Sequence, residues 1–329
     1  MLIHEGNHIG DSWYFVKGGT CHCFYLTCPV EKERHTVWEI AHATSGDLIN
    51  WRKHGIVVKQ GHEGEWDCHC LSTGSIIERN GRYWMAYTGE WNAPIVKIGI
   101  AVSDDLFHWE KVSYNPILTP SEALFSTQGR GIRKFCHWRD PKLMEYEGKI
   151  YALICATSKK APIDACGEVA ICQTEDMQNW DVTGEVSVES VCQELECPQI
   201  YYINGVYVLL FSCFKELFSE DIIRKYGNKL RQTSYYMVSN SIWGPYKFVP
   251  DFELLPADCT DVNQNVQYAN QLIKWNGRWY ILGTVWSEDG DYIADGREVR
   301  FSKGKLFTVD TNSFLQHTES KIESSEMLI

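Results

Sequence analysis

The stretch Gly81-Arg82-Tyr83-Trp84-Met85-Ala86-Tyr87 places a glycine directly before a run of aromatic and apolar residues. The same phrase recurs four more times along the chain, beginning at Gly19, Gly148, Gly205 and Gly277. A tight hairpin turn needs a residue with positive φ, which glycine provides, and the run after it is typical of a buried strand. The five copies divide nearly the whole chain into units of similar length.

Each unit holds further strands. A second motif ending in tryptophan follows the first three copies, at 45–51, 103–109 and 174–180, with an apolar strand before it and a short strand after it. Radially repeated four-stranded antiparallel sheets are typical of β-propellers, whereas a β-sandwich would not repeat one four-strand phrase five times. We therefore predict an all-β fold, a single five-bladed β-propeller over residues 1–317 with four antiparallel strands per blade.

The blades are expected at about 9–60, 66–120, 136–192, 196–255 and 266–312, and residues 318–329 are expected to form a polar C-terminal tail. The fourth blade carries an insertion at 215–231. Its residues 221–226 predict a short helix that ends at Gly227.

The composition excludes several classes of protein. Of 329 residues 44% are hydrophobic, which indicates a packed globular chain, and the net charge is −12. We therefore expect no nucleic-acid or membrane partner and favour a neutral ligand. We expect no signal peptide and no membrane span, because the first residues hold no basic and apolar regions and no apolar run is long enough to span a bilayer. Its 13 cysteines suit reduced thiols, so we expect a cytoplasmic protein.

Three carboxylic acids recur near the start of the first strand of a blade. Asp11 and Asp140 lie eight residues before the repeat glycine of their blades, and Glu196 lies nine before its own. We interpret this as one repeat position on the strand that lines the central channel, so the three side chains should converge. Thr73 and Ala269 stand there in the other two blades, so an acid is not a general requirement of the turn.

Converging carboxyl groups can cleave glycosidic bonds. One protonated carboxyl group gives a proton to the leaving oxygen, and one ionised group attacks the sugar or activates water. Crowding of like charges raises the pKa of one member of such a group, which keeps it protonated near neutral pH.

Two of these acids lie in motifs of a known family. Trp138-Arg139-Asp140-Pro141-Lys142 resembles the Arg-Asp-Pro motif, and Glu196-Cys197-Pro198 the Glu-Cys-Pro motif, of glycoside hydrolase family 32, which contains invertases, levanases and inulinases. Cys70-Leu71-Ser72-Thr73-Gly74-Ser75 is similar to its Phe-Ser-Gly-Ser segment, and Tyr268-Ala269-Asn270-Gln271 to its Tyr-Ala-x-Gln segment. The resemblance thus extends over the blades and implies a five-bladed propeller.

The resemblance implies Asp11 as nucleophile, Glu196 as general acid/base and Asp140 as the residue that stabilises the transition state. The chain departs from the family at Gly10-Asp11-Ser12-Trp13, where the family has Asn-Asp-Pro-Asn-Gly, and at Gln199, where an aspartate usually follows Glu-Cys-Pro. The C-terminal β-sandwich typical of the family is expected to be absent, as in a short branch.

Further residues are candidates for substrate binding, each with a structural alternative. The tryptophans could stack on a sugar or fill the core, and the residues just before the inner strand of blade 2 could meet substrate or form a turn. Arg139 could pair with a neighbouring carboxylate or with a sugar hydroxyl. The predicted substrate-binding residues are Trp13, Trp66, Asp67, His69, Ser72, Arg139, Gln199, Tyr268 and Gln271.

Two short patterns invite a zinc hypothesis, namely Cys21-His22-Cys23 and Cys68-His69-Cys70. In a strand the two cysteines of such a pattern share one face and the histidine points to the other. Neither pattern has the two-residue spacer of zinc knuckles. We therefore expect no metal and no cofactor.

The sequence thus predicts a β-fructofuranosidase-like exo-hydrolase that acts on a small oligosaccharide or glycoside, a furanoside, by retaining double displacement. One alternative is an inverting arabinofuranosidase or xylosidase in which Asp11 activates water. Another is a carbohydrate-binding propeller without catalysis. A glycan phosphorylase is less favoured, because the only basic cluster lies in the insertion of blade 4.

Overall fold

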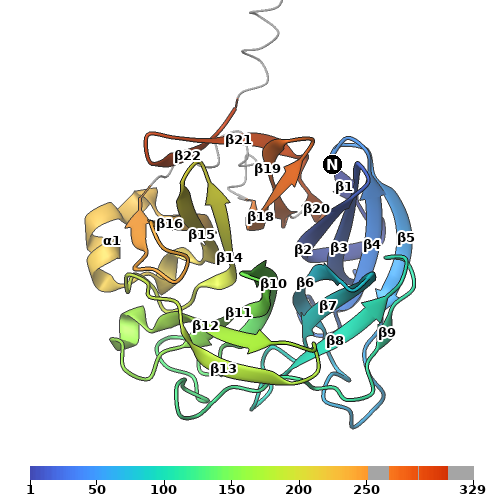
Figure 1. The fold of residues 1–329 in the computed structure, drawn as a ribbon, viewed down its shortest axis with the longest axis horizontal. Helices are drawn as coiled ribbons and strands as arrows, with labels where there is room; N and C mark the ends of the chain where they lie inside the picture. The colour runs from blue at the N-terminus through green and yellow to red at the C-terminus, as the bar shows by residue number, and fades with distance from the viewer. Residues whose placement is uncertain (251–266, 288, 310–329) are drawn as a thin grey trace, which may run out of the picture.

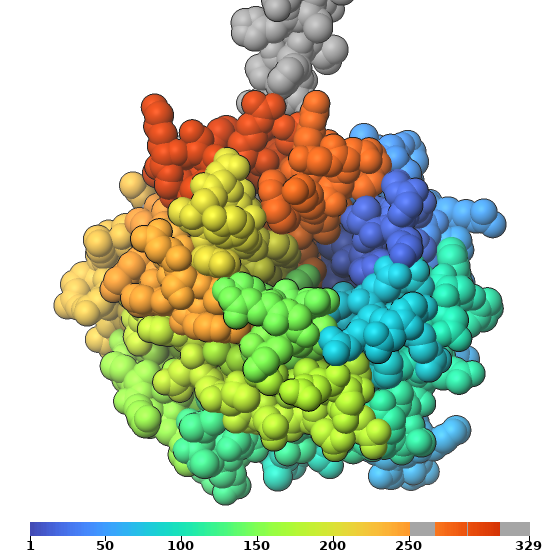
Figure 2. Space-filling model, viewed as in Figure 1, coloured from blue at the N-terminus to red at the C-terminus, as the bar shows by residue number. Residues whose placement is uncertain are grey.

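Five antiparallel sheets surround a central axis in the computed structural model (Figure 1), which describes residues 1–250, 267–287 and 289–309. The innermost strands are β2 (Asn7–Lys17), β6 (Ser72–Arg79), β10 (Trp138–Tyr146), β14 (Glu196–Ile203) and β18 (Tyr268–Trp275). Side chains from all parts of the ring meet around the axis on the face shown in Figure 2. The predicted all-β five-bladed propeller is confirmed.

The remaining strands of each blade follow outward in chain order. Blade 1 adds β3 (Thr20–Pro29), β4 (Glu39–Ser45) and β5 (Arg52–Val58), and blade 2 adds β7 (Arg82–Thr88), β8 (Ile98–Ser103) and β9 (Glu110–Lys111). Blade 3 adds β11 (Lys149–Thr157), β12 (Gly167–Thr174) and β13 (Trp180–Glu185), and blade 4 adds β15 (Val206–Cys213), β16 (Thr233–Ser239) and β17 (Lys247–Val249). Blade 5 adds β19 (Arg278–Val285), β21 (Arg297–Ser302) and β22 (Lys305–Thr308). The predicted ends of blades 4 and 5 and the tail 318–329 lie outside the described residues.

The insertion in blade 4 contains the short helix that the sequence predicts. The α1 helix (Glu220–Tyr226) begins after Ser219, whose hydroxyl accepts a hydrogen bond from the backbone N–H of Ile222, and it ends at Gly227 with φ of 47°. Single 3₁₀ turns precede it at Lys215–Leu217 and follow it at Gly227–Lys229, and another lies at Ile163–Ala165. Among the helices described, none is long and apolar enough to cross a membrane.

The repeat glycines form the inner hairpin of every blade. Between β6 and β7 the two loop residues Asn80 and Gly81 have φ of 53° and 74°. Positive φ at both central residues is the requirement of a type I′ turn, whose twist matches that of the strands. The repeat glycines of the other four blades also have positive φ. The sequence motif that recurs five times therefore marks a hairpin in each blade.

The ring closes between the first and last parts of the chain. β1 (Leu2–Ile3) pairs antiparallel with β20 (Tyr292–Ile293), an extra strand on the sheet of blade 5. Leu2 is 2% exposed, so this short strand is fixed by burial as well as by hydrogen bonds. The apolar core fills the spaces between adjacent sheets, as where Trp13 and Phe24 of blade 1 pack with Tyr87 of blade 2.

A bulge interrupts every innermost strand near its start. In β2 the register shifts between Ile9 and Ser12, and equivalent shifts occur in β6, β10, β14 and β18. Aligned on this bulge, Glu196 directly precedes it, Asp140 is its first residue and Asp11 its second. The prediction of a single repeat position is therefore wrong in detail, because β2 has one more residue than β10 and β14 between the bulge and the hairpin turn. A bulge re-aims side chains, and these three acids still face the axis.

A histidine cluster lies between blades 1 and 2. His22 Nδ1 is 3.0 Å from His42 Nε2, the two rings stack, and His42 also stacks on Phe24. Cys21 and Cys23, the neighbours of His22, instead lie in the core shared by blades 1 and 5. Burial lowers the pKa of His22 to about 4 and that of His42 to about 3, so both rings are neutral in the folded protein.

We expect this cluster to make the fold sensitive to acid. The unfolded chain binds protons at these histidines below pH about 6.5, whereas the folded chain does not, so stability is full above that pH and falls as the pH is lowered towards about 4. His42→Phe should reduce this loss by about 2 kcal/mol, measured by urea unfolding at pH 7 and pH 4.5. The exposed-site variant His62→Phe serves as control, and equal losses in both variants would contradict the assignment.

Candidate active site

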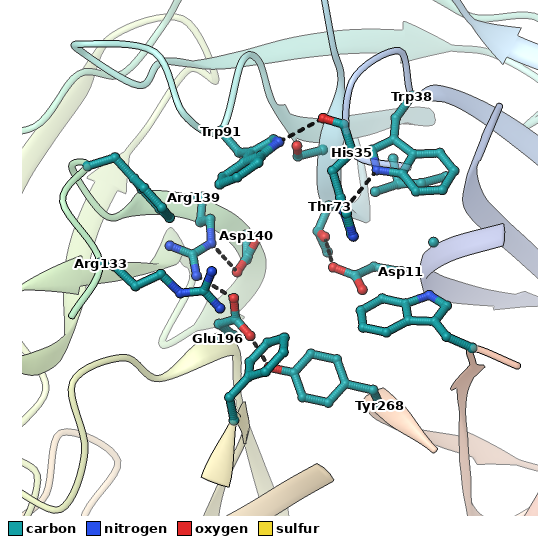
Figure 3. Close-up of a pocket in the computed structure, with 16 residues that line it drawn as sticks. Asp11, His35, Trp38, Thr73, Trp91, Arg133, Arg139, Asp140, Glu196 and Tyr268 are labelled. Carbon is teal, nitrogen blue, oxygen red and sulfur yellow. Dashed lines mark hydrogen bonds and ion pairs between the residues drawn. The ribbon is translucent and has the colours of Figure 1, made fainter. Parts of the chain in front are cut away.

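All five blades contribute to one pocket around the axis (Figure 3). Its lining includes Asp11 from blade 1, Thr73 from blade 2, Asp140 from blade 3, Glu196 from blade 4 and Tyr268 from blade 5. The three acids therefore converge, as the sequence predicts. Carboxylate oxygens of Asp11 and Asp140 lie within 4.8 Å of one another.

Asp11 is held through one of its two oxygens. Its Oδ2 accepts hydrogen bonds from the Thr73 hydroxyl and, at 3.8 Å, from the Cys197 thiol. No donor among the described residues contacts Oδ1. One oxygen therefore fixes the side chain while the other stays available to a bound molecule.

Asp140 is fixed by its backbone as well as its side chain. It takes φ of 60° at the bulge of β10, and its N–H donates to the Thr88 hydroxyl at 2.9 Å. Its Oδ2 accepts from the Cys197 N–H at 3.1 Å and lies 3.5 Å from Arg139 Nε. A left-handed conformation costs free energy in a non-glycine residue, so the surrounding contacts must offset this cost to hold the carboxyl group in place.

Glu196 accepts from two donors at once, the Arg139 guanidinium and the Tyr268 hydroxyl. The same guanidinium group bridges Asp140 and Glu196, because Nε faces the first and Nη2 the second. Arg139 is 5% exposed, so its charge acts in a medium that screens poorly.

A fourth acid, Glu194, lies behind this centre and was not singled out from the sequence. It is fully buried and contacts Arg139 Nη2 at 2.8 Å, His137 Nδ1 at 3.1 Å and Arg133 Nε at 3.3 Å. The signal in the sequence was its spacing, because residues two apart on an extended chain share a face and Glu194 precedes Glu196 by two. Two guanidinium groups thus partly compensate four carboxyl groups.

The electrostatics favour retention of a proton near neutral pH. Burial raises the pKa of Asp140 to about 7, against the opposing effect of Arg139. Burial also raises the pKa of Asp11 and of Glu196, and the charge of Glu194 raises that of Glu196 further. A cluster in which one carboxyl group is protonated and another ionised can do both halves of acid-base or nucleophilic catalysis.

Three of the predicted substrate-binding residues line the pocket, namely Ser72, Arg139 and Tyr268. Arg139 and Tyr268 are both engaged with Glu196. Their contribution in this structure is to orient the acid, and their contact with substrate stays a prediction.

Three further predicted residues, Trp13, Trp66 and Asp67, lie outside the pocket lining. Trp13 is fully buried in the core, and Trp66 stacks on Tyr87. Asp67 accepts hydrogen bonds from the Tyr87 hydroxyl at 3.0 Å and from Lys111 at 2.6 Å. These side chains are already occupied by partners inside the protein.

His69, Gln199 and Gln271 do not line the pocket either. His69 is exposed and lies 3.8 Å from Glu90. The Gln199 side-chain amide donates to two backbone carbonyls, both at 3.0 Å, and the Gln271 side chain accepts from Lys142 at 3.3 Å. Both glutamines connect inner strands, and contact of these three residues with substrate stays a prediction.

Two groups of side chains in the described part of the chain have ligand atoms close enough to share a metal ion. One is Asp11, Asp140 and Cys197, and the other is Cys68, His69 and Glu90. Burial holds the pKa of the Cys197 thiol well above its usual value, which disfavours the thiolate that a metal needs. The expectation of no metal stays a prediction.

A family model and several relatives match this chain. The model described as the glycosyl hydrolases family 32 N-terminal domain matches residues 11–301. A sucrose-6-phosphate hydrolase of Streptococcus mutans is 24% identical over 93% of this chain and 61% of its own length. One of Staphylococcus xylosus is 24% identical over 85% of this chain and 53% of its own length. The chain thus spans little more than half the length of these relatives.

Solved structures share the fold. An inulosucrase from Halalkalicoccus jeotgali bound to kestose superposes with a TM-score of 0.73 at 20% identity, covering 93% of this chain and 87% of that one. The levansucrase of Bacillus subtilis gives a TM-score of 0.70 at 15% identity, with the same coverage of both chains. These similarities support the five-bladed propeller.

We expect Glu194→Gln to lower the pKa of Glu196, because the variant removes a negative charge that raises it. The variant also removes a carboxylate that pairs with the buried Arg139, so the free energy of unfolding should fall by about 3 kcal/mol. Carbon-13 NMR titration of the carboxyl groups and urea unfolding measure the two effects. Glu63→Gln, at an exposed site, is the control, and an unchanged or higher pKa of Glu196 would refute the role of Glu194.

Proposed function

The chain belongs to glycosyl hydrolase family 32, and from this premise we propose that it is a β-fructofuranosidase-like glycosidase that removes one terminal furanosyl unit from a small sugar. The observation that carries the proposal is the convergence of Asp11, Asp140 and Glu196 on one pocket, where Arg139 bridges Asp140 and Glu196. Cleavage of a glycosidic bond needs such a set of carboxyl groups in different protonation states.

In the proposed reaction the Oδ1 atom of Asp11 attacks the anomeric carbon while Glu196 gives its proton to the leaving oxygen. The C–O bond to the leaving group breaks as the bond to Asp11 forms, which yields a covalent glycosyl-enzyme. Glu196, now ionised, takes a proton from water, and the resulting hydroxide displaces Asp11. The sugar is released with its original anomeric configuration after two inversions.

Asp140 is proposed to stabilise the transition state. Its carboxyl group would accept hydrogen bonds from ring hydroxyls and offset the positive charge that develops on the sugar. The hydrogen bond from the Cys197 N–H and the positive φ of Asp140 support this role, because both fix the group before substrate arrives.

We propose a fructosyl unit as the transferred sugar and sucrose or a short fructoside as the substrate. The names of the relatives, sucrose-6-phosphate hydrolases, and the kestose bound to the inulosucrase support this choice. Comparison of kcat/KM for sucrose and sucrose 6-phosphate tests whether a phosphate on the leaving group is preferred.

We further propose that residues 1–317 form one catalytic unit that acts in the cytoplasm. Contributions of all five blades to the pocket support a single unit. The cysteines of the described residues are all free thiols, as is usual for proteins of a reducing compartment.

Glu196→Gln should lower kcat on sucrose by about 10²–10⁴-fold, because the amide cannot give up a proton. The loss should be smaller on 4-nitrophenyl β-fructofuranoside, whose phenolate leaves without protonation. Initial rates on both substrates measure the effect. Glu145→Gln, on the exposed side of β10, is the control, and full activity of a folded Glu196→Gln protein would end the assignment.

The stereochemistry of the first-formed product distinguishes the retaining mechanism from the inverting one. We expect methanol added to the reaction to give methyl β-fructofuranoside, because the glycosyl-enzyme is attacked from the face that the leaving group vacated. Proton NMR at early times identifies the anomer. Methyl α-fructofuranoside would instead favour the inverting mechanism, with Asp11 as the base for water.

A further inference from the structure

An aromatic collar lies beside the acids, drawn from blades 1, 2, 4 and 5 and from the loop that leads into blade 3. We define it as the closed ring formed, in order, by His35, Trp286, Tyr268, Phe214, Arg133, Phe135 and Trp91. Neighbouring ring centroids are 5.0–6.3 Å apart, and the Arg133 guanidinium lies 4.9 Å over Phe214 and 5.9 Å over Phe135. The ring is continuous, and its members line the same pocket as the acids.

The collar is most open to solvent at His35. Asp140 is 5% exposed and Asp11 and Glu196 are partly exposed, whereas His35 is exposed. A terminal sugar that binds against the acids therefore directs its leaving group towards the solvent side of the pocket, where His35 lies. This step rests on the proposed function.

Most donors of the collar are already engaged within the protein. The indole N–H groups of Trp91 and Trp286 each donate to a backbone carbonyl at 3.0 Å, and the Tyr268 hydroxyl donates to Glu196. Arg133 uses Nε on Glu194. Among the described residues, no acceptor contacts the Nε2 atom of His35 or the two Nη atoms of Arg133.

The contacts of His35 determine which of its ring nitrogens carries the proton. Trp38 Nε1, which can only donate, lies 3.3 Å from His35 Nδ1. Nδ1 must then be the acceptor, so the proton of the neutral ring is on Nε2. Enclosure by its neighbours lowers the pKa of His35, which keeps the ring neutral, although the charges of Asp11 and Glu196 oppose this effect.

The backbone holds His35 in place as firmly as the ring contacts do. Its φ is 69°, and its carbonyl oxygen accepts from Trp91 Nε1 at 3.0 Å and from the Cys70 thiol at 3.4 Å. The preceding residue, Arg34, forms a bidentate ion pair with the buried Asp291. The Nε2–H group therefore has a fixed position at the rim of the pocket.

We propose that His35 is a specificity-determining residue that donates its Nε2–H to a hydroxyl oxygen of the leaving group. The ligand class is an uncharged, hydroxyl-bearing ring, such as a sugar, whose C–H faces lie against the aromatic collar. A neutral donor provides this hydrogen bond without placing a second positive charge beside Asp11. A polar site of this kind discriminates against a leaving group that lacks the hydroxyl.

The test compares kcat/KM for sucrose, which has a hydroxylated leaving group, with that for 4-nitrophenyl β-fructofuranoside, which has none. His35→Phe keeps the ring but removes the donor, and we expect it to lower the sucrose-to-aryl ratio of kcat/KM by about tenfold. His35→Gln restores a donor near the position of Nε2 and should recover part of the ratio. His62→Phe, at an exposed site away from the pocket, should leave the ratio unchanged.

The outcomes separate this inference from the proposed function. If the wild-type protein cleaves neither substrate, the proposed function fails and the inference falls with it. If the wild-type protein is active and His35→Phe lowers both activities equally, or neither, only the inference is overturned. Nitrogen-15 NMR gives an independent readout, because the proposal requires a proton on Nε2 and none on Nδ1 of His35.

Discussion

Closure of the ring is the constraint on which the rest of this structure depends. Five four-stranded sheets arranged side by side leave one apolar face of the first sheet and one of the last uncovered unless these two sheets meet. The pairing of β1 with β20 and the core between blades 1 and 5 complete that contact. Only in the closed ring do the starts of the five innermost strands face one another, and only there do their side chains form a pocket.

Convergence brings an electrostatic cost that Arg139 offsets. Four carboxyl groups around one axis would repel one another strongly in a buried site. The guanidinium group of Arg139 lies against three of them, and His137, whose pKa burial holds well below its usual value, accepts a hydrogen bond from it rather than adding charge. The carboxyl groups outnumber the guanidinium groups, and this excess of negative charge favours retention of a proton by one of the carboxyl groups.

The sequence predicted what local chemistry determines. Hairpin glycines, the capped insertion helix and the acids within short motifs follow from neighbours along the chain. Glu194, Arg133 and His35 were missed because their roles come from residues that lie far away in sequence or in loops without a repeat. Asp67 was predicted near substrate, but it pairs with Lys111, a partner 44 residues away that no local pattern indicates. Counting from the hairpin glycine likewise could not show that β2 has one more residue after its bulge than β10 and β14 have.

The pairing of β1 with β20 has a consequence for synthesis of the protein. Blades 1 to 4 can hydrogen-bond their own strands as soon as they leave the ribosome, but the first strand has no partner until residue 293 has emerged. Until then Leu2 of β1 stays exposed to water, and so do the sheet faces at the two ends of the incomplete ring. The pocket is thus among the last features to assemble, and nascent chains stalled before that point should bind chaperones and lack every activity of the finished ring.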